Sequence, residues 1–291
     1  MNAMDIATLL LTPGIGRKNT FKLLEQYGEA DLTINYLKEI ITNKFYEISS
    51  IELHNSCEKS KRIMDWAEKK HIKIVDFKSS RYPSSLKAID DPPLLLFIKG
   101  DYEFIRKEEN CIGVIGSRMP TDYGKEISKM VGRYLAKKNI GVISGLALGC
   151  DAGAHTGCLE YKGKTAAILA HGLNMIYPNE NKKLAEEIIA SGGCIISEYF
   201  PYETPKQYSF IERDRIQSGL SKGIIVIETE ETGGTMHTVR FARKQKKKIG
   251  CMKYSNVFNK YPTLKGNEII LNHMESVPIK NYKDIDAFIK K

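Results

Sequence analysis

Three short segments of the chain combine glycine with groups that hold phosphate. They are Gly116-Ser117-Arg118, the run from Gly145 to Gly149 with Asp151 close behind it, and Gly233-Gly234-Thr235. Glycine lets a ligand approach the backbone closely, and unpaired N–H groups at a helix N-terminus attract an anion. Ser117 can donate a hydrogen bond, and the guanidinium of Arg118 can hold phosphate as a bidentate fork. Each segment alone is weak evidence, but together they predict one ligand that carries phosphate.

Two further arginines stand in the segment Phe210-Ile211-Glu212-Arg213-Asp214-Arg215-Ile216. Arg213 and Arg215 lie two positions apart, so they do not share one face of a helix. We expect one of them to point toward a ligand while the other pairs with an acid. The alternative is an exposed, salt-bridged start of a helix. Both arginines are candidate phosphate contacts.

Asp151 and His155 follow the second glycine segment, where a helical pattern begins. Asp151 is well placed as the N-cap residue of that helix, and it belongs to the predicted site together with Gly145 and Gly149. For both Asp151 and His155 a structural role is favoured over a chemical one, with His155 packed and hydrogen-bonded.

The N-terminal region contains a fourth glycine turn, Pro13-Gly14-Ile15-Gly16, between two short amphipathic patterns. It resembles a helix-hairpin-helix, in which the turn presents N–H groups to phosphate and Arg17 and Lys18 add positive charge. Gly14, Gly16, Arg17 and Lys18 are therefore candidates for a second nucleic-acid contact. A tight turn in a helical bundle without a ligand explains the pattern equally well.

The elements that must position these residues are readable from His71 onward, where apolar runs alternate with helical patterns. The predicted strands are Ile72–Phe77, Leu94–Ile98, Cys111–Ile115, Gly141–Ser144, Thr165–Leu169, Cys194–Ser197, Ile224–Ile227 and Lys248–Cys251. The predicted helices between them are Tyr123–Lys138, Ala152–Tyr161, Asn181–Ala190 and Met236–Lys246. This alternation indicates an α/β fold with a mostly parallel sheet covered on both faces. Ligands of such sheets bind at the carboxyl ends of the strands, where the three glycine segments fall.

The chain divides in composition near residue 75. Residues 1–75 are poor in strand patterns and predict a small helical domain of the helix-hairpin-helix or SAM-like kind, with an amphipathic helix over Glu58–Lys70. Residues 76–291 predict the α/β core with a short C-terminal extension, which ends in a helix over Tyr282–Lys290.

Charge and cysteine content narrow the class of function. The chain has 291 residues and 44 Lys plus Arg against 35 Asp plus Glu, a net charge of +9 that weakly favours a polyanionic partner. Its six cysteines have no CxxC spacing, so we expect neither a disulfide framework nor structural zinc. Without a secretion signal or an apolar run of about 20 residues, we expect a cytoplasmic protein with no membrane contact.

Seven segments in order carry a resemblance to a known family. They are Arg81–Asp101 (RYPSSLKAIDDPPLLLFIKGD), Gly116–Arg118, Ser144–His155 (SGLALGCDAGAH), Gly172–Asn181 (GLNMIYPNEN), Ile196–Glu198 with Pro201, Phe210–Ser221 (FIERDRIQSGLS) and Gly233–Thr238 (GGTMHT). Their order and spacing resemble the DNA-processing protein A (DprA/Smf) family over residues 80–250.

The resemblance implies an extended Rossmann-like domain that binds single-stranded DNA in a basic pocket and has no catalytic activity or cofactor. It also implies a homodimer that loads a RecA-type recombinase during natural transformation. Arg118, Arg213 and Arg215 become the phosphate contacts, and the loops Gly145–Gly149 and Gly233–Thr235 the backbone donors. No C-terminal winged helix is expected.

Two departures from the family pattern concern the site. The family's Arg-Asn-Arg is here Arg213-Asp214-Arg215, and its Val-Pro-Gly after the last strand is replaced by Met252-Lys253. The extra carboxylate of Asp214 either weakens anion binding or pairs with an arginine.

Two other functions stay open. One is a nucleotide sensor or a phosphoribohydrolase-like enzyme on a related Rossmann-like fold. Such hydrolases carry a catalytic glutamate on the helix after the glycine loop, and the helix after Gly233-Gly234-Thr235 lacks it. This absence argues against hydrolysis but not against nucleotide sensing. A metal-dependent nuclease requires Asp151, Glu198 and Glu228 to converge from separate strand ends, which nothing in the sequence supports.

Overall fold

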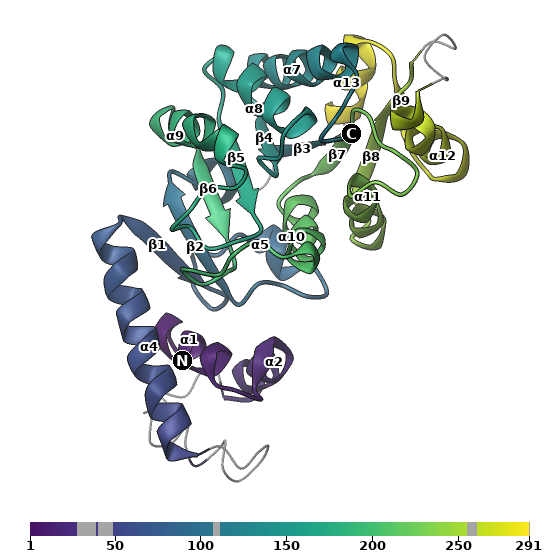
Figure 1. Ribbon diagram of the computed structural model, residues 1–291. Coiled ribbons are helices and arrows are strands. Elements are labelled where there is room, and N and C mark those ends of the chain that lie inside the picture. The colour runs from purple at the N-terminus through teal and green to yellow at the C-terminus, as the bar shows by residue number, and fades with distance from the viewer. Residues whose placement is uncertain (28–38, 40–48, 107–110, 255–260, 291) are drawn as a thin grey trace. The chain divides into compact units, whose positions relative to one another are not determined.

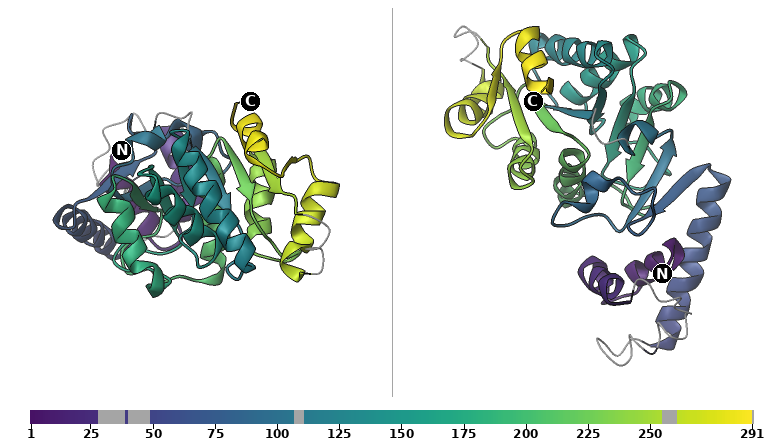
Figure 2. Two further views of the ribbon diagram at one scale, coloured as in Figure 1. Left: turned by 90° about the horizontal axis from the view of Figure 1, so that it is seen from above. Right: turned by 180° about the vertical axis from the view of Figure 1, so that it is seen from behind.

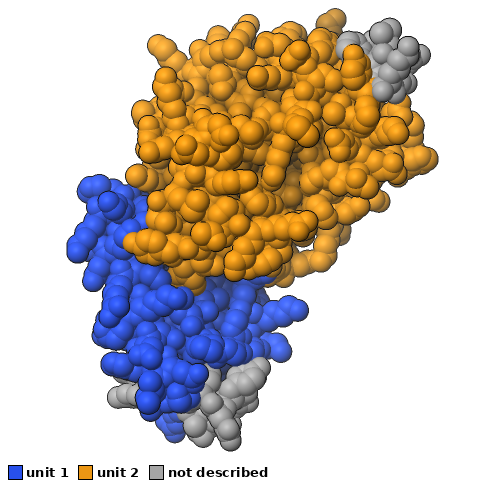
Figure 3. Space-filling model, viewed as in Figure 1, with its two compact units in different colours: residues 1–82, 93–98 blue, residues 83–92, 99–291 orange. Residues whose placement is uncertain are grey.

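The structure is a computed structural model that describes residues 1–27, 39, 49–106, 111–254 and 261–290 (Figure 1). It forms two compact units, one of residues 1–82 with 93–98 and one of residues 83–92 with 99–291 (Figure 3). The domain boundary expected near residue 75 stays a prediction.

The first unit is built mainly from helices, as the N-terminal sequence pattern predicts. Asn2 caps the first helix in a capping box with Asp5, and Ser49 caps a later helix with Glu52 in the same way. The hydroxyls of Thr8 and Ser60 join these two helices at 2.8 Å. The elements are α1 (Ala3–Leu11), α2 (Gly16–Tyr27), α4 (Ser50–Lys69), β1 (Ile72–Asp76) and most of β2 (Leu95–Gly100).

The turn between α1 and α2 has the backbone that its glycines were expected to allow. Gly14 and Gly16 adopt φ angles of +82° and +60°, a region that side chains with a Cβ disfavour. Ile15 between them is buried with Leu9, Leu23 and Leu53. The turn is therefore anchored by its apolar residue, while Gly14, Gly16 and Lys18 are exposed.

The second unit holds a parallel sheet with strand order β6-β5-β4-β3-β7-β8-β9. From β3 the chain adds β4, β5 and β6 in turn on one side. It then returns and places β7 on the other side of β3. The crevice between β3 and β7 is thus the topological switch point, where open α/β sheets bind ligands. These strands are β3 (Cys111–Ile115), β4 (Gly141–Ser144), β5 (Thr165–Leu169), β6 (Cys194–Ser197), β7 (Gly223–Val226), β8 (Lys248–Met252) and β9 (Val277–Ile279).

Helices cover both faces of this sheet (Figures 1 and 2). One face packs apolar residues of α7, α8 and α13 against the central strands, and the opposite face packs α11 and α12. Alternate residues of β7 serve the two layers, since Ile225 lies in the first cluster and Ile224 in the second. The helices of the unit are α5 (Ser84–Lys87), α6 (Glu103–Arg106), α7 (Asp122–Lys137), α8 (Cys150–Glu160), α9 (Lys182–Ala190), α10 (Gln207–Gly219), α11 (Thr235–Lys244), α12 (Lys265–His273) and α13 (Tyr282–Lys290), with short 3-10 turns at Asn179–Asn181 and Pro262–Leu264.

The α/β class and the parallel sheet are confirmed, and the eight predicted strands end within two residues of the observed ones. The C-terminal helix over Tyr282–Lys290 is also confirmed. All six cysteines are buried and free, in agreement with the expectation of no disulfide framework. The tail prediction partly covers residues 255–260 and 291, which lie outside the described residues.

Candidate functional site

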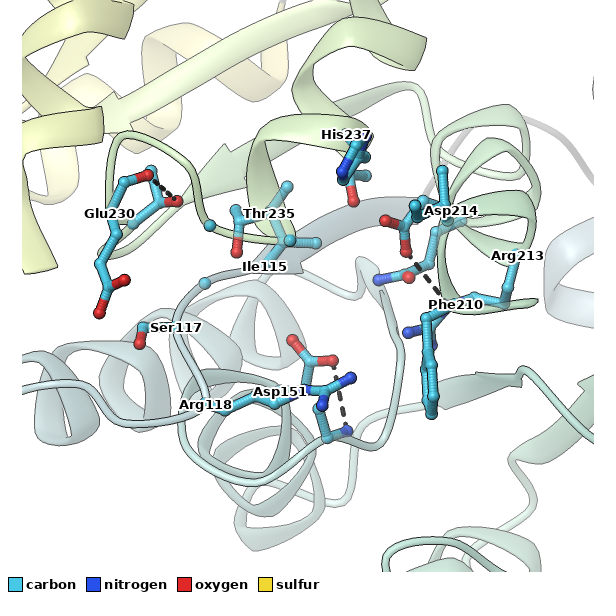
Figure 4. Close-up of a pocket in the computed structure, with 18 of the residues that line it drawn as sticks. Ile115, Ser117, Arg118, Asp151, Phe210, Arg213, Asp214, Glu230, Thr235 and His237 are labelled. Atoms are coloured by element: carbon cyan, nitrogen blue, oxygen red, sulfur yellow. Dashed lines mark hydrogen bonds and ion pairs between the residues drawn. The ribbon is translucent and has the colours of Figure 1, made fainter. Parts of the chain in front are cut away.

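A pocket of about 600 Å³ opens at the carboxyl ends of β3 and β7 (Figure 4). The lining comes from the end of β3, the loops after β3, β4 and β7, the start of α8, and helices α10 and α11. The lining consists of Ile115, Gly116, Ser117, Arg118, Met119, Ala147, Asp151, Gln207, Phe210, Ile211, Arg213, Asp214, Gln217, Thr229, Glu230, Thr232, Gly233, Gly234, Thr235, His237 and Thr238. The three predicted glycine segments therefore reach one pocket, which lies at the switch point of the sheet.

The loop after β3 presents Arg118 at the mouth of the pocket. The Ser117 N–H donates to the Glu228 carbonyl at 2.7 Å, which ties this loop to the end of β7. The Glu228 carboxylate accepts from the Thr121 N–H and hydroxyl at 2.8 and 2.6 Å and so holds the start of α7. Arg118 is exposed, and its guanidinium lies 4.8 Å from the centre of the Phe210 ring. Among the described residues it has no ion-pair partner, so its charge is available to a ligand.

The loop after β4 is held by the side chain of Asp151. One Asp151 oxygen accepts from the N–H groups of Gly145 and Ala147 at 3.1 and 3.3 Å. The N-cap of α8 is Gly149, with a φ angle of +77°, and it makes no side-chain cap bond. The prediction that Asp151 caps α8 is therefore wrong, because its side chain turns back to the preceding loop. His155 is buried and hydrogen-bonded to the Thr165 hydroxyl, as the structural role predicts.

The loop after β7 supplies backbone donors at the start of α11. The N–H groups of Gly234 and Thr235 donate to no residue that the structure describes, and both residues line the pocket. They lie at the positive end of the α11 dipole. A cluster of unpaired N–H groups at a helix N-terminus is a ready anion site, as the Gly233-Gly234-Thr235 segment predicts.

Solved structures of other bacterial proteins share this fold. The X-ray structure of DNA processing protein A from Streptococcus pneumoniae matches with a TM-score of 0.82 and 25% identity, and it covers 99% of this chain and 98% of its own. The family model for DNA recombination-mediator protein A matches residues 73–289. The chain belongs to this family.

Individual members of the family differ in how much of their length they share with this chain. DNA processing protein DprA of Bacillus subtilis is 34% identical over 254 residues, 84% of each chain. Protein Smf of Escherichia coli is 35% identical over 185 residues, which are 63% of this chain and 49% of that protein. The Helicobacter pylori DNA processing protein A, solved to show how it binds single-stranded DNA, matches with a TM-score of 0.65 at 29% identity over 76% of this chain and 95% of its own.

The two arginines of α10 occupy different environments within this family fold. Arg213 lines the pocket and lies 3.2 Å from the Asp214 carboxylate, while its Nη1 donates to the Ile168 carbonyl. It packs so closely on Gly145 that a Cβ there would lie 2.0 Å from Nη1. Arg213 is thus a fixed part of the pocket floor.

Arg215 is not brought to the pocket. Its two Nη atoms donate to both oxygens of Glu198 at 2.6 Å, and its Nε donates to the Asp91 carbonyl at 2.8 Å. Arg215 is thus the arginine that pairs with a distant acid, as expected for one of the two, while contact of Arg213 with a ligand stays a prediction. The alternative of an exposed helix start is wrong, because Arg213 and Arg215 are 5% and 3% exposed.

The pocket floor contains two carboxyl groups beside Arg213. Burial and the nearby Asp151 raise the pKa of Asp214 to about 7, although Arg213 opposes the shift. Burial also raises the pKa of Asp151, again against the effect of Arg213. At this position the family pattern has asparagine, and here the extra carboxylate pairs with an arginine, one of the two outcomes expected from the sequence. The floor is therefore acidic, in contrast to the cationic mouth.

The carboxylates considered for a nuclease serve three separate tasks. Asp151 holds the loop after β4, Glu198 binds Arg215, and Glu228 binds Thr121. Across the described part of the chain, no group of three or more His, Cys, Asp or Glu side chains is arranged to hold a metal ion. Within the same residues no helix is both long and apolar enough to cross a membrane.

The pocket residues that the sequence analysis missed include three polar ones on its helices: Asp214 as a lining group, Gln217 and Thr238. The helical spacing of Phe210, Asp214 and Gln217 is the signal that indicates a shared face. The candidates Gly14, Gly16, Arg17 and Lys18 belong to the first unit, and their contact with nucleic acid stays a prediction.

Proposed function

We propose that this protein binds single-stranded DNA at the pocket, chiefly through its phosphates and with little dependence on sequence. The observation that carries the proposal is the convergence of Arg118 and the free N–H groups of Gly234 and Thr235 on one pocket at the switch point. Cationic and backbone donors of this kind bind a phosphate chain regardless of its bases.

Membership of the family supports the same ligand. The Helicobacter pylori member binds single-stranded DNA, and it shares the fold of the described core. By family resemblance we further propose a cytoplasmic homodimer without catalytic activity that loads a RecA-type recombinase in natural transformation. We assign phosphate contact to Arg118 and the Gly233–Thr235 loop, and a positioning role to Gly145, Gly149 and Asp151. Arg215 is left out of the contact set because Glu198 occupies its guanidinium.

The test is a salt titration of binding to a labelled oligothymidylate. Single-strand binding predicts a log–log salt slope of about −0.7 for each phosphate neutralised. Arg118→Ala should weaken affinity roughly tenfold or more, because it removes a charged hydrogen bond. It should also make the log–log salt slope shallower by about 0.7, because one phosphate fewer is neutralised. Arg133→Ala is the matched control, because Arg133 is an exposed arginine on α7 that pairs with Glu160 outside the pocket.

Unchanged affinity in Arg118→Ala, with normal thermal unfolding, contradicts the proposed contact. The pocket also has the volume of a small-molecule site, so a nucleotide sensor is the competing function. Saturable binding of a mononucleotide without oligomer binding favours the sensor and overturns the proposal.

A further inference from the structure

Helix α10 presents a row of different side chains to the pocket. Phe210, Asp214 and Gln217 are spaced by four and three residues, so they lie on one face of the helix, and all three line the pocket. Their burial increases along the row, from half-buried Phe210 through Asp214 at 7% exposed to Gln217 at 2%. The row therefore runs from the mouth of the pocket to its floor.

Gln217 lines the pocket with a side-chain amide that the described residues leave without a hydrogen bond. Its backbone carbonyl accepts from the Ser221 hydroxyl, but its amide makes no hydrogen bond to any residue within the described ranges. Among the described residues its amide atoms are not part of the set that is both fully buried and unpaired, so they reach the open space of the pocket. An amide that lines a pocket in this state is expected to meet a ligand group.

Asp214, three residues before Gln217 on α10, adds an acceptor to the same pocket. Its carboxylate lies 3.2 Å from Arg213 Nε, and the Thr238 side chain opposes the rise in the pKa of Asp214 that burial causes. Asp151 faces the same pocket from α8, so the floor holds two carboxyl groups and one guanidinium. Because this floor is rich in oxygen acceptors, it suits a group with several N–H donors better than it suits phosphate.

We propose that the pocket floor takes the edge of one guanine base of the bound strand, with its N1–H and N2–H₂ donating to Asp214 and its O6 accepting from the Gln217 amide. This inference rests on the proposed function, because the phosphates at the mouth hold the strand in place. Guanine alone offers two adjacent donors beside an acceptor on one edge. Thymine offers one donor between two carbonyl oxygens, and adenine and cytosine each offer one amino group beside an acceptor.

Such a pocket is compatible with broad binding of natural DNA. The protein distinguishes the base at only one position of the strand, while the groups at the mouth contact only phosphate. A strand can slide until a guanine reaches the floor. The preference is therefore visible only when guanine is absent or scarce.

The experiment compares labelled oligothymidylates that carry dG, dA, dC or dT at one central position. A carboxylate that pairs with two donors discriminates by about 1–3 kcal/mol, so the dG oligomer should bind roughly tenfold more tightly than the all-dT oligomer. Asp214→Asn, nearly isosteric, should reduce this preference to less than about twofold while all-dT binding is retained or improved. Gln217→Leu should reduce the preference in part, and Glu187→Gln, an exposed carboxylate on α9 that does not line the pocket, should leave it unchanged.

The outcomes separate this inference from the proposed function. Equal affinity for all four oligomers, each with a steep salt dependence, overturns the guanine pocket and leaves single-strand binding intact. A preference for dG that survives in Asp214→Asn also overturns it. Tight binding of free dGMP without binding of any oligomer overturns both proposals, because the guanine source is then a mononucleotide.

Discussion

The two sides of helix α10 carry charged groups of the same kinds but satisfy them to different degrees. On one side Arg215 binds Glu198 through two hydrogen bonds and the Asp91 carbonyl through a third. On the pocket side, within the described ranges, Arg118 has no ion-pair partner and the Gln217 amide has no hydrogen bond, while Asp151 and Asp214 both lie near Arg213. Charged groups whose hydrogen bonds are all made within the protein stabilise the fold. Polar groups with unmade hydrogen bonds are able to bind a ligand.

The largest expected effect is the loss of stability when Arg215 is removed from its ion pair with Glu198. Arg215→Met should lower the free energy of unfolding by about 3–5 kcal/mol, because it leaves the Glu198 carboxylate buried without its partner. Chemical denaturation measures this change. The double variant Arg215→Met, Glu198→Leu should recover most of the loss, since both charges are then gone. A single variant as stable as the wild type but defective in DNA binding would show that Arg215 belongs to the pocket side.

The second prediction concerns the ionisation of Asp214. Its pKa is raised to about 7 in the folded protein from an ordinary value of 3.8, so its contribution to stability is fully present below pH 3.8 and is lost as pH rises through 7. Asp214→Asn removes this dependence. The stability advantage of the variant over the wild type should grow by about 3 kcal/mol between about pH 5 and pH 8.5.

Denaturation of both proteins at the two pH values measures this difference. Asp151, whose pKa is also raised, is present in both proteins, so its titration cancels to first order in the comparison. An advantage that does not change with pH would mean that Asp214 is ionised throughout and that Arg213 compensates its burial fully.

The smallest expected effect is at Phe210, beneath the Arg118 guanidinium. Phe210→Leu removes a cation–π contact of about 0.5–1 kcal/mol, so affinity for oligothymidylate should fall about two- to fivefold with little change in thermal unfolding. Tyr161→Leu is the control, because Tyr161 is an exposed aromatic residue at the end of α8 that does not line the pocket. Equal small losses in both variants would remove Phe210 from the site.

Local patterns in the sequence predicted the sheet well but missed the helix that matters most for the pocket. Apolar, β-branched runs such as Cys111–Ile115 and Thr165–Leu169 match the observed strands residue for residue. Helix α10 lacks an apolar stripe because it buries Arg213, Asp214, Gln217 and other polar residues. Its sequence therefore shows no amphipathic period, and its helical character was considered only as an alternative. The strand β9 was missed because it has three residues, one of them Pro278.

The sequence by itself determined the α/β class, the positions of the glycine loops at the strand ends, and the presence of arginines near them. These follow from local periodicity and from glycine's freedom of backbone, which need no distant partner. Only the tertiary structure decided three roles. Asp151 accepts hydrogen bonds from the loop after β4, Arg215 forms an ion pair with Glu198, and Asp214 and Gln217 line the pocket. Those roles depend on partners up to 124 positions away in the chain, as Arg215 and Asp91 are, and on burial that only packing creates.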